Sequence, residues 1–331
     1  MIISRAPVRI SLFGGGTDYP DYYLRHGGAV LGTTIDKYVY VSINRLSNFF
    51  EYKIRVGYSK SELVNSVNDI AHPSVRECLK FRNMDGNLDI HIFSDLPART
   101  GLGSSSTFTV GFLNALYALE GKMVPKERLA KDALYIEQQV LKENVGSQDQ
   151  IHAAFGGINV IEFDARGFRI RPVAITEEKR EALRESMMVF FTGQTRYANE
   201  ILKEQVERTR AAENDHYLER MHAMVLEAER IVSDESCEKM LRRIGELMHE
   251  SWQLKKTLSS RVTNDVIDKA YEVALSAGAY GGKLSGAGGG GFLTLIVHPE
   301  KQKAVRAALK GFLEVGFGFE DEGSTIIYIK H

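Results

Sequence analysis

Cysteine is scarce in this sequence, and long hydrophobic runs are absent. The chain has 331 residues but only two cysteines, Cys78 and Cys237, and neither belongs to a CxxC pair. A disulfide framework is therefore excluded and a cysteine-based zinc site is disfavoured, so we expect reduced thiols in a cytoplasmic protein. The longest apolar run that we find, residues 292–297 with a threonine inside it, is far shorter than the roughly 20 residues that cross a bilayer.

The sequence also lacks an excess of charge of either sign. Its formal net charge is −1, although charged residues make up 26% of the chain. No broad electrostatic field would therefore attract nucleic acid or an anionic membrane, and we expect neither as a partner. Any anionic ligand must instead be held by a local group of residues.

The length of 331 residues favours two domains, since a domain typically has about 150 residues. Strand and helix patterns alternate along the chain, with a helix expected to begin at Pro73, and they predict an α+β fold with two layers in each half. The charged run 177–185 is either a linker or an exposed helix, and the domain boundary is placed there. We therefore expect an N-terminal domain over residues 1–180 and a C-terminal domain over residues 181–331.

Glycine gathers in three places, and one of them predicts a phosphate-binding loop. The segment PARTGLGSSST, residues 97–107, lies between an expected strand at 88–93 and an amphipathic helix. A helix N-terminus offers free backbone N–H groups and a partial positive charge, which together bind anions. Gly101 and Gly103 would let the loop close round a phosphate. An ordinary serine-capped helix would need only one of the three serines.

Two familiar nucleotide-binding motifs do not account for these glycines. The Walker A pattern GxxxxGK[ST] is absent, because no lysine follows the glycines of the loop. Residues 286–291 match GxGxxG, but they precede the β-like run 292–297 instead of a helix. A dinucleotide-binding Rossmann fold needs a helix at that point, so this fold is rejected.

Two carboxylates stand in positions that suit catalysis. Glu137 shares the apolar face of an expected helix with Ala130, Leu134 and Leu141. It is either a partner in a buried ion pair or a ligand for Mg²⁺, which prefers carboxylate and hydroxyl oxygens. Asp149 lies among small and apolar residues in GSQDQIHAAFGG. It either complements a helix dipole or acts as the general base of a phosphoryl transfer.

Three segments together resemble the GHMP kinase family, which includes galactokinase, homoserine kinase and mevalonate kinase. They are APVRISLFGGGTDYP at residues 6–20, PARTGLGSSST at 97–107 and KLSGAGGGGF at 283–292, in the family's order and spacing. The resemblance covers nearly the whole chain. It implies a ribosomal protein S5 domain 2-like N-terminal domain, a ferredoxin-like C-terminal domain, and a small-molecule kinase that uses ATP and Mg²⁺.

The resemblance also implies roles for single residues, matched by position. Asp149 corresponds to the catalytic aspartate, and Arg9 to the arginine that stabilises charge beside it. Glu137 and Ser105 correspond to the Mg²⁺ ligands, and Asp18 to the aspartate that binds sugar hydroxyls. The loop expected to bind ATP, in which Ser104 is the alternative metal ligand, comprises Pro97, Arg99, Gly101, Leu102, Gly103, Ser104, Ser105 and Ser106.

The opening segment departs from galactokinases, which carry a Glu-His pair where this chain has Gly15 and Gly16. The loss of two polar side chains makes room beside Asp18, so Gly16 is expected in the substrate site and galactose is disfavoured. The segments GGGTDYP, 55–79, GSQDQIHAAFGG and TGQTRYANEIL look closest to the heptose kinases, and fucokinases share much of the pattern.

The likeness to heptose kinases implies phosphorylation of D-glycero-D-manno-heptose 7-phosphate at its anomeric hydroxyl. The phosphate of such a substrate needs a cation, and Arg196 is a candidate because arginine binds phosphate bidentately. Arg196 is alternatively a strand cap or the partner of a helix carboxylate, and Lys283 is either a second candidate or a surface lysine. An unphosphorylated sugar such as fucose, another small alcohol, and a non-catalytic sensor of ATP and sugar remain alternatives. The oligomeric state stays open, with a homodimer included.

Overall fold

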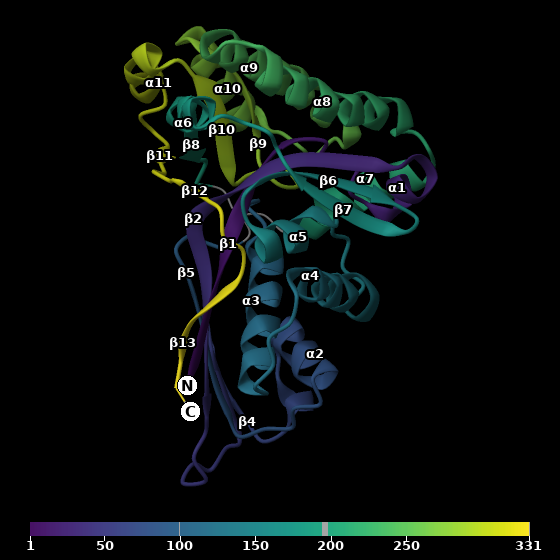
Figure 1. The fold of residues 1–331 in the computed structure, drawn as a ribbon, viewed down its shortest axis with the longest axis vertical. Helices are drawn as coiled ribbons and strands as arrows, with labels where there is room; N and C mark the ends of the chain where they lie inside the picture. The colour runs from purple at the N-terminus through teal and green to yellow at the C-terminus, as the bar shows by residue number, and fades with distance from the viewer. Residues whose placement is uncertain (99, 194–197, 331) are drawn as a thin grey trace.

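The computed structural model describes residues 1–98, 100–193 and 198–330. Strands form one nine-stranded and one four-stranded sheet, and helices pack against both (Figure 1). The predicted α+β, two-layer organisation is therefore confirmed. Within the described part of the chain, no helix combines the length and the apolar character needed to cross a membrane.

The first sheet has nine strands grouped around its longest member. These strands are β1 (Ile2–Phe13), β2 (Gly28–Arg45), β3 (Ile54–Gly57), β4 (Ser61–Val64), β5 (Leu88–Ser94), β6 (Ile158–Asp164), β7 (Gly167–Pro172), β12 (Phe319–Glu320) and β13 (Thr325–Ile329). The main order is β13-β1-β2-β5-β3-β4. The long strand β2 pairs with β1 on one side, and on the other side with β6 near its start and β5 near its end.

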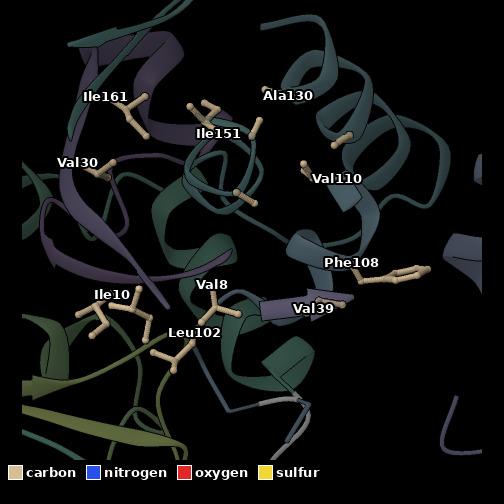
Figure 2. Packing of buried hydrophobic residues seen from close by; sticks show 14 of the residues in the cluster. Val8, Ile10, Val30, Val39, Leu102, Phe108, Val110, Ala130, Ile151 and Ile161 are labelled. Atoms are coloured by element: carbon tan, nitrogen blue, oxygen red, sulfur yellow. The ribbon is translucent and has the colours of Figure 1, made fainter. Parts of the chain in front are cut away.

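Helix α3 (Ser104–Leu119) is the central helix packed on this sheet. Residues 106–113 are all buried, because the helix is apolar on nearly every side. Gly111 faces β1, where a Cβ atom would lie 3.4 Å from the Cβ of Ala6, an ordinary packing distance. Figure 2 shows Val8 of β1 and Val110 of α3 within one apolar cluster. This packing fixes where α3 begins, and therefore where the predicted phosphate loop ends.

The other helices of the first half are short. They are α1 (Pro20–His26), α2 (Pro73–Phe81), α4 (Lys126–Leu134) and α5 (Gln148–Phe155). The helix expected from Pro73 is confirmed as α2. The chain leaves α4 through a π-helical turn, Tyr135–Val140, which carries Glu137. Such turns are rare and occur often at functional sites.

The second sheet is a smaller antiparallel unit. Its strands are β8 (Met187–Phe191), β9 (Ala279–Leu284), β10 (Phe292–Val297) and β11 (Leu313–Glu314), in the order β11-β8-β10-β9. Every residue of β10 is buried, as expected of a central strand covered on both faces.

In the described part of the second half, six helices accompany this sheet. They are α6 (Glu177–Ser186), α7 (Ala198–Arg210), α8 (Asp215–Asp234), α9 (Cys237–Leu258), α10 (Asp265–Ser276) and α11 (Gln302–Ala308). The charged run 177–185 lies in α6, so the helix alternative is confirmed and the linker alternative is wrong. Thr176 caps this helix by accepting a hydrogen bond from the N–H of Lys179 at 3.3 Å.

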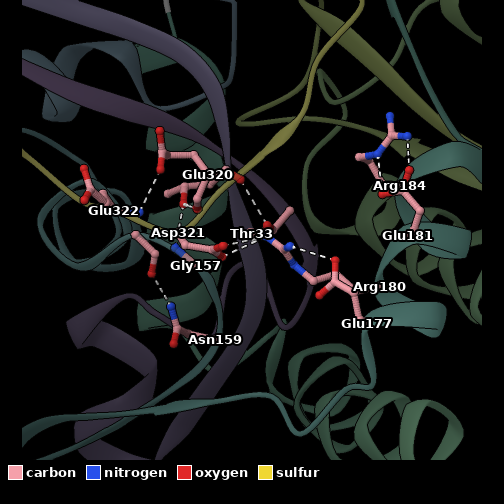
Figure 3. A network of polar contacts seen from close by, with 12 residues as sticks. Thr33, Gly157, Asn159, Glu177, Arg180, Glu181, Arg184, Glu320, Asp321 and Glu322 are labelled. Carbon is pink, nitrogen blue, oxygen red and sulfur yellow. Dashed lines mark hydrogen bonds and ion pairs between the residues drawn. The ribbon is translucent and has the colours of Figure 1, made fainter.

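The last part of the chain returns to the first sheet, where β12 pairs with β2 and β13 with β1 (Figure 1). Polar contacts hold this returning segment in place (Figure 3). The N–H of Gly157 donates to the carbonyl oxygen of Glu320 at 2.9 Å, and Arg180 donates to Asp321 at 2.8 Å. Because β12 and β13 pair with strands of the first sheet, residues 319–329 belong to that sheet. The domain boundary near residue 180 stays a prediction.

Candidate active site

The predicted phosphate loop, residues 97–107, joins β5 to the N-terminus of α3. Gly101 and Gly103 have φ angles of 84° and 78°, a region that favours glycine. Among the described residues, no side chain caps the N-terminus of α3, so its first N–H groups are available for an anionic ligand. The strand, loop and helix thus have the arrangement that the sequence predicted.

The C-terminal glycine motif packs backbone to backbone against this loop. A Cβ atom added at Gly286 would lie 2.4 Å from the Cα of Gly101, and one at Gly291 would lie 2.2 Å from the carbonyl oxygen of Thr100. Only residues without a side chain permit this approach. Thr192 holds the same motif, since its hydroxyl donates to the carbonyl oxygen of Gly291 at 3.0 Å. The motif therefore positions the phosphate loop, although no helix follows it.

Arg9 joins the predicted catalytic aspartate to the phosphate loop. Its guanidinium donates from Nε to Oδ1 of Asp149 at 2.8 Å, and Nη2 lies 2.7 Å from the same oxygen. Its Nη1 donates to the carbonyl oxygen of Gly101 at 2.7 Å. Asp149 itself lies against the loop, because a Cβ atom at Gly103 would be 2.9 Å from its Oδ2. The structure thus brings Arg9 and Asp149 together at the loop.

Asp18 lies almost fully buried on the loop between β1 and α1. Its carboxylate accepts hydrogen bonds from the N–H of Gly16 and from Nε2 of Gln148, each at 3.0 Å. Burial raises the pKa of Asp18 and the charge of Asp149 raises it further, whereas the hydrogen bonds from Gly16 and Gln148 lower it. Asp18 and Asp149 are therefore close enough to repel each other and border one site.

Glu137 is only 1% exposed and faces the start of α3. Its Oε2 accepts hydrogen bonds from Oγ of Ser106 at 2.7 Å and from Nε2 of Gln150 at 2.5 Å. Burial raises the pKa of Glu137 to about 7, although the hydrogen bonds from Ser106 and Gln150 favour the charged form. Its Oε1 is buried and has no hydrogen-bond partner within the described residues.

The surroundings of Glu137 suit a divalent cation. An unpaired carboxylate oxygen beside a serine hydroxyl is a donor set of the kind that Mg²⁺ prefers. In the part of the chain that the structure describes, no group of three or more His, Cys, Asp or Glu side chains gathers to hold a metal. Mg²⁺ at Glu137 would therefore take further ligands from water and from ATP phosphates.

The remaining loop residues differ in burial. Leu102 is buried in the core, and its carbonyl oxygen accepts the N–H of Arg9 at 3.1 Å. Ser105 is exposed and Ser104 is half-buried, so Ser106 is the serine whose hydroxyl contacts Glu137. Pro97 is exposed too, and its carbonyl oxygen accepts the hydroxyl of Thr100. Arg99 and Arg196 lie outside the described residues, and their expected roles stay predictions.

Three buried residues of the site were missed or misjudged from the sequence. Gln148 and Gln150 flank Asp149 and bond to Asp18 and Glu137 respectively, so the pattern Gln-Asp-Gln was the available signal. The surface-lysine alternative for Lys283 is wrong, because this residue is 3% exposed. Its strand, β9, was not predicted.

Comparisons with known proteins address the family directly. The family model for the GHMP kinase N-terminal domain matches residues 65–157, and the model for the C-terminal domain matches residues 232–315. This chain belongs to the GHMP kinase family. It is therefore a small-molecule kinase that uses ATP, and the expected two-domain GHMP fold is confirmed.

Named relatives of this GHMP kinase include sugar kinases. It is 30% identical to the D-glycero-alpha-D-manno-heptose 7-phosphate kinase of Campylobacter jejuni, over 97% of each chain. It is 27% identical to the bifunctional fucokinase/GDP-fucose pyrophosphorylase of Arabidopsis thaliana, over 93% of this chain and 31% of that protein. The crystal structure of a D-glycero-D-manno-heptose 1-phosphate kinase from Bacteroides thetaiotaomicron matches with a TM-score of 0.73 and 26% identity, over 100% of both chains. The predicted likeness to heptose kinases is confirmed.

The contact between the glycine motif and the phosphate loop leads to a prediction about Gly286→Ala. The new Cβ atom would meet the backbone of Gly101, and the φ angle of 72° strains any other residue. Such strain costs roughly 1–3 kcal/mol, so we expect about a tenfold weaker affinity for ATP. Calorimetric titration with ATP measures the effect. Gly311→Ala is the control, because nothing lies within 4 Å of its Cβ position, and equal affinities in both variants would contradict the prediction.

Proposed function

We propose that this kinase transfers the γ-phosphate of ATP to the anomeric hydroxyl of D-glycero-D-manno-heptose 7-phosphate and releases the 1,7-bisphosphate. The observation behind the proposal is the position of Asp149, which contacts Arg9 and the loop at Gly103 and interacts electrostatically with Asp18. A carboxylate between a phosphate loop and a sugar-binding aspartate is placed to act on a sugar hydroxyl. The heptose kinases named among the relatives support the choice of sugar.

In this proposal Asp149 orients the attacking hydroxyl and accepts its proton. Phosphoryl transfer depends mainly on positioning and charge neutralisation, with a carboxylate near the nucleophile. Arg9 binds one oxygen of Asp149 through two nitrogens, which directs the carboxylate and leaves its other oxygen beside the phosphate loop. The positive charge of Arg9 also stabilises the negative charge that develops during transfer.

Glu137 and Ser106 are the residues that we assign to Mg²⁺, with Ser105 as the alternative favoured by the family resemblance. Held there by Glu137 and Ser106, Mg²⁺ would supply positive charge that neutralises the phosphates of ATP. The unpaired Oε1 of Glu137 and its bond to Ser106 support the assignment. Gln150 donates to both Glu137 and Ser106 and so holds the pair together.

The position of the phosphate that the sugar carries before the reaction differs between the named relatives. The Campylobacter relative is named a 7-phosphate kinase, whereas the Bacteroides relative is named a 1-phosphate kinase. Arg196 is our candidate for binding the phosphate that the substrate already carries. The room that Gly15 and Gly16 were expected to leave beside Asp18 stays a prediction, because a Cβ atom at Gly16 would lie 2.8 Å from Cδ2 of Leu218.

A second candidate substrate is fucose. Its support is the 27% identity to a fucokinase over 93% of this chain. Fucose carries no phosphate, so this alternative needs no cation at Arg196.

A substrate panel tests the proposal. ADP release with Mg²⁺ and ATP is measured with heptose 7-phosphate, heptose 1-phosphate, fucose, mannose, galactose and no acceptor. We expect turnover with the 7-phosphate well above all others, and an acid-labile anomeric phosphate in the product. Turnover with the 1-phosphate would move the reacting hydroxyl to the other end of the sugar, and turnover with fucose alone would replace the heptose.

The role of Asp149 predicts the behaviour of Asp149→Asn. Loss of the general base lowers kcat by roughly 10²- to 10⁴-fold while ATP still binds. Steady-state kinetics with the preferred sugar measure kcat, and Asp234→Asn, an exposed aspartate on α8, is the control. Full activity in Asp149→Asn would exclude it as the base.

The metal assignment predicts that Glu137→Gln raises the Mg²⁺ concentration needed for half-maximal rate by roughly 10- to 100-fold. We expect the same direction for Ser106→Ala and a smaller change for Ser105→Ala. Titration of Mg²⁺ at saturating ATP measures these values, with the exposed Glu246→Gln as the control. An unchanged Mg²⁺ requirement in Glu137→Gln would remove it from the metal site, and a larger effect of Ser105→Ala would favour Ser105 as the ligand.

A further inference from the structure

Lys283 is buried where two loops of the active site meet. It lies on β9, and its Nζ donates to the carbonyl oxygen of Leu12 at 3.0 Å. Leu12 precedes the loop that carries Asp18, whereas the residues after Lys283 form the glycine motif that packs on Gly101. One side chain therefore connects the sugar side of the site to the ATP side.

The charges that face Lys283 come from three neighbouring parts of the chain. They are Arg9 on β1, Asp18 on the following loop and Lys255 on α9. Lys255 is also buried, and its Nζ donates to two backbone carbonyl oxygens at the start of the glycine motif, one of them at 2.9 Å. Among the described residues, neither lysine has a carboxylate within ion-pair distance, and the hydrogen bonds of both ammonium groups go to backbone carbonyl oxygens.

This arrangement places two ammonium groups without a carboxylate partner in a buried site. Arg9, Lys255 and Lys283 are its cationic groups and Asp149 and Asp18 its carboxylates, and burial lowers the pKa of both lysines. An ammonium group buried without a counter-ion carries a large desolvation cost, which an apolar side chain of similar size would avoid. A bound anion would offset that cost, and the glycine motif that follows Lys283 packs on the loop where we expect the phosphates of ATP.

We propose that Lys283 is a positioning residue of the kinase, which holds the sugar loop to the glycine motif through Leu12 and presents its positive charge to the phosphoryl group in transfer. The inference rests on the proposed function. Under this proposal two cationic side chains act on the phosphoryl group, Arg9 from the first sheet and Lys283 from the second sheet. A purely structural lysine would hold Leu12 equally well, but its charge would have no effect on the reaction.

The protonation of Lys283 separates these two roles. Burial and the charge of Arg9 lower the pKa of Lys283 to about 7, whereas Asp18 raises it. In the free protein the ammonium is therefore charged below pH 7 and becomes neutral as the pH rises through 7. A bound phosphate favours the charged form and raises the pKa of Lys283.

Kinetics of Lys283→Arg and Lys283→Met test the proposal. For the unmodified kinase we expect kcat/KM for the sugar to fall as the pH rises above 7, because this ratio reports on the free enzyme. In Lys283→Arg the guanidinium stays charged, so this decline moves above pH 9 while activity is largely kept. Lys283→Met should lose roughly 10²-fold in kcat, the usual effect of removing one charge-stabilising donor. Lys239→Met, an exposed lysine on α9, should match the unmodified kinase at every pH.

Two outcomes would overturn the proposal. One is a decline of kcat/KM in Lys283→Arg at the same pH as in the unmodified kinase, and the other is a kcat within about twofold of normal in Lys283→Met. Titration of the ¹⁵N-labelled lysine ammonium signals, with Lys283 assigned from the Arg variant, is independent of turnover. Addition of Mg²⁺ and a non-hydrolysable ATP analogue should raise the pKa of Lys283. If no sugar in the panel is phosphorylated, the proposed function fails. The role of Lys283 is rejected separately if the ATP analogue leaves the pKa of Lys283 unchanged.

Discussion

The close approach of two backbone segments, the glycine motif and the phosphate loop, is the constraint on which the site depends. Gly286 lies so near Gly101 that a single additional carbon atom between them would overlap the chain. The two segments come from different sheets, so this contact sets how the second sheet sits on the first. The direction of the phosphate loop, the position of Arg9 on its carbonyl oxygen and the placement of Asp149 all follow from it.

Around this contact the kinase buries several charged groups, and each makes hydrogen bonds within the protein before any ligand binds. Arg9 is bound to Asp149, Asp18 to the first residue of α5, and Glu137 to the first turn of α3. Dipoles and charges fixed in advance need little rearrangement when charge develops during a reaction, and this is the main electrostatic advantage of an enzyme over water. The cost is a set of carboxylates and ammonium groups whose pKa values are displaced from their usual ranges.

Structural features that depend on a short local sequence pattern could be predicted from the sequence. Features that depend on contacts between distant parts of the chain could not. Pro73 marks the start of α2, and paired glycines before three serines mark the loop at α3. The bond between Ser106 and Glu137 depends on how the first turn of α3 faces the π-helical turn, which no local pattern encodes. The burial of Lys283 depends on β9, whose two glycines hide the strand pattern, and the pairing of β12 and β13 joins opposite ends of the chain.

The return of β13 to the edge of β1 has a consequence for how the protein is made. Ile2 pairs with Ile329, so the outer edge of β1 at residues 2–5 stays open until the ribosome has synthesised β13. Contacts of such long range form slowly, and an unpaired strand edge is a site for association with other chains. The nascent protein therefore passes through a period in which its first strand must remain shielded, by its own helices or by a chaperone, before the sheet closes.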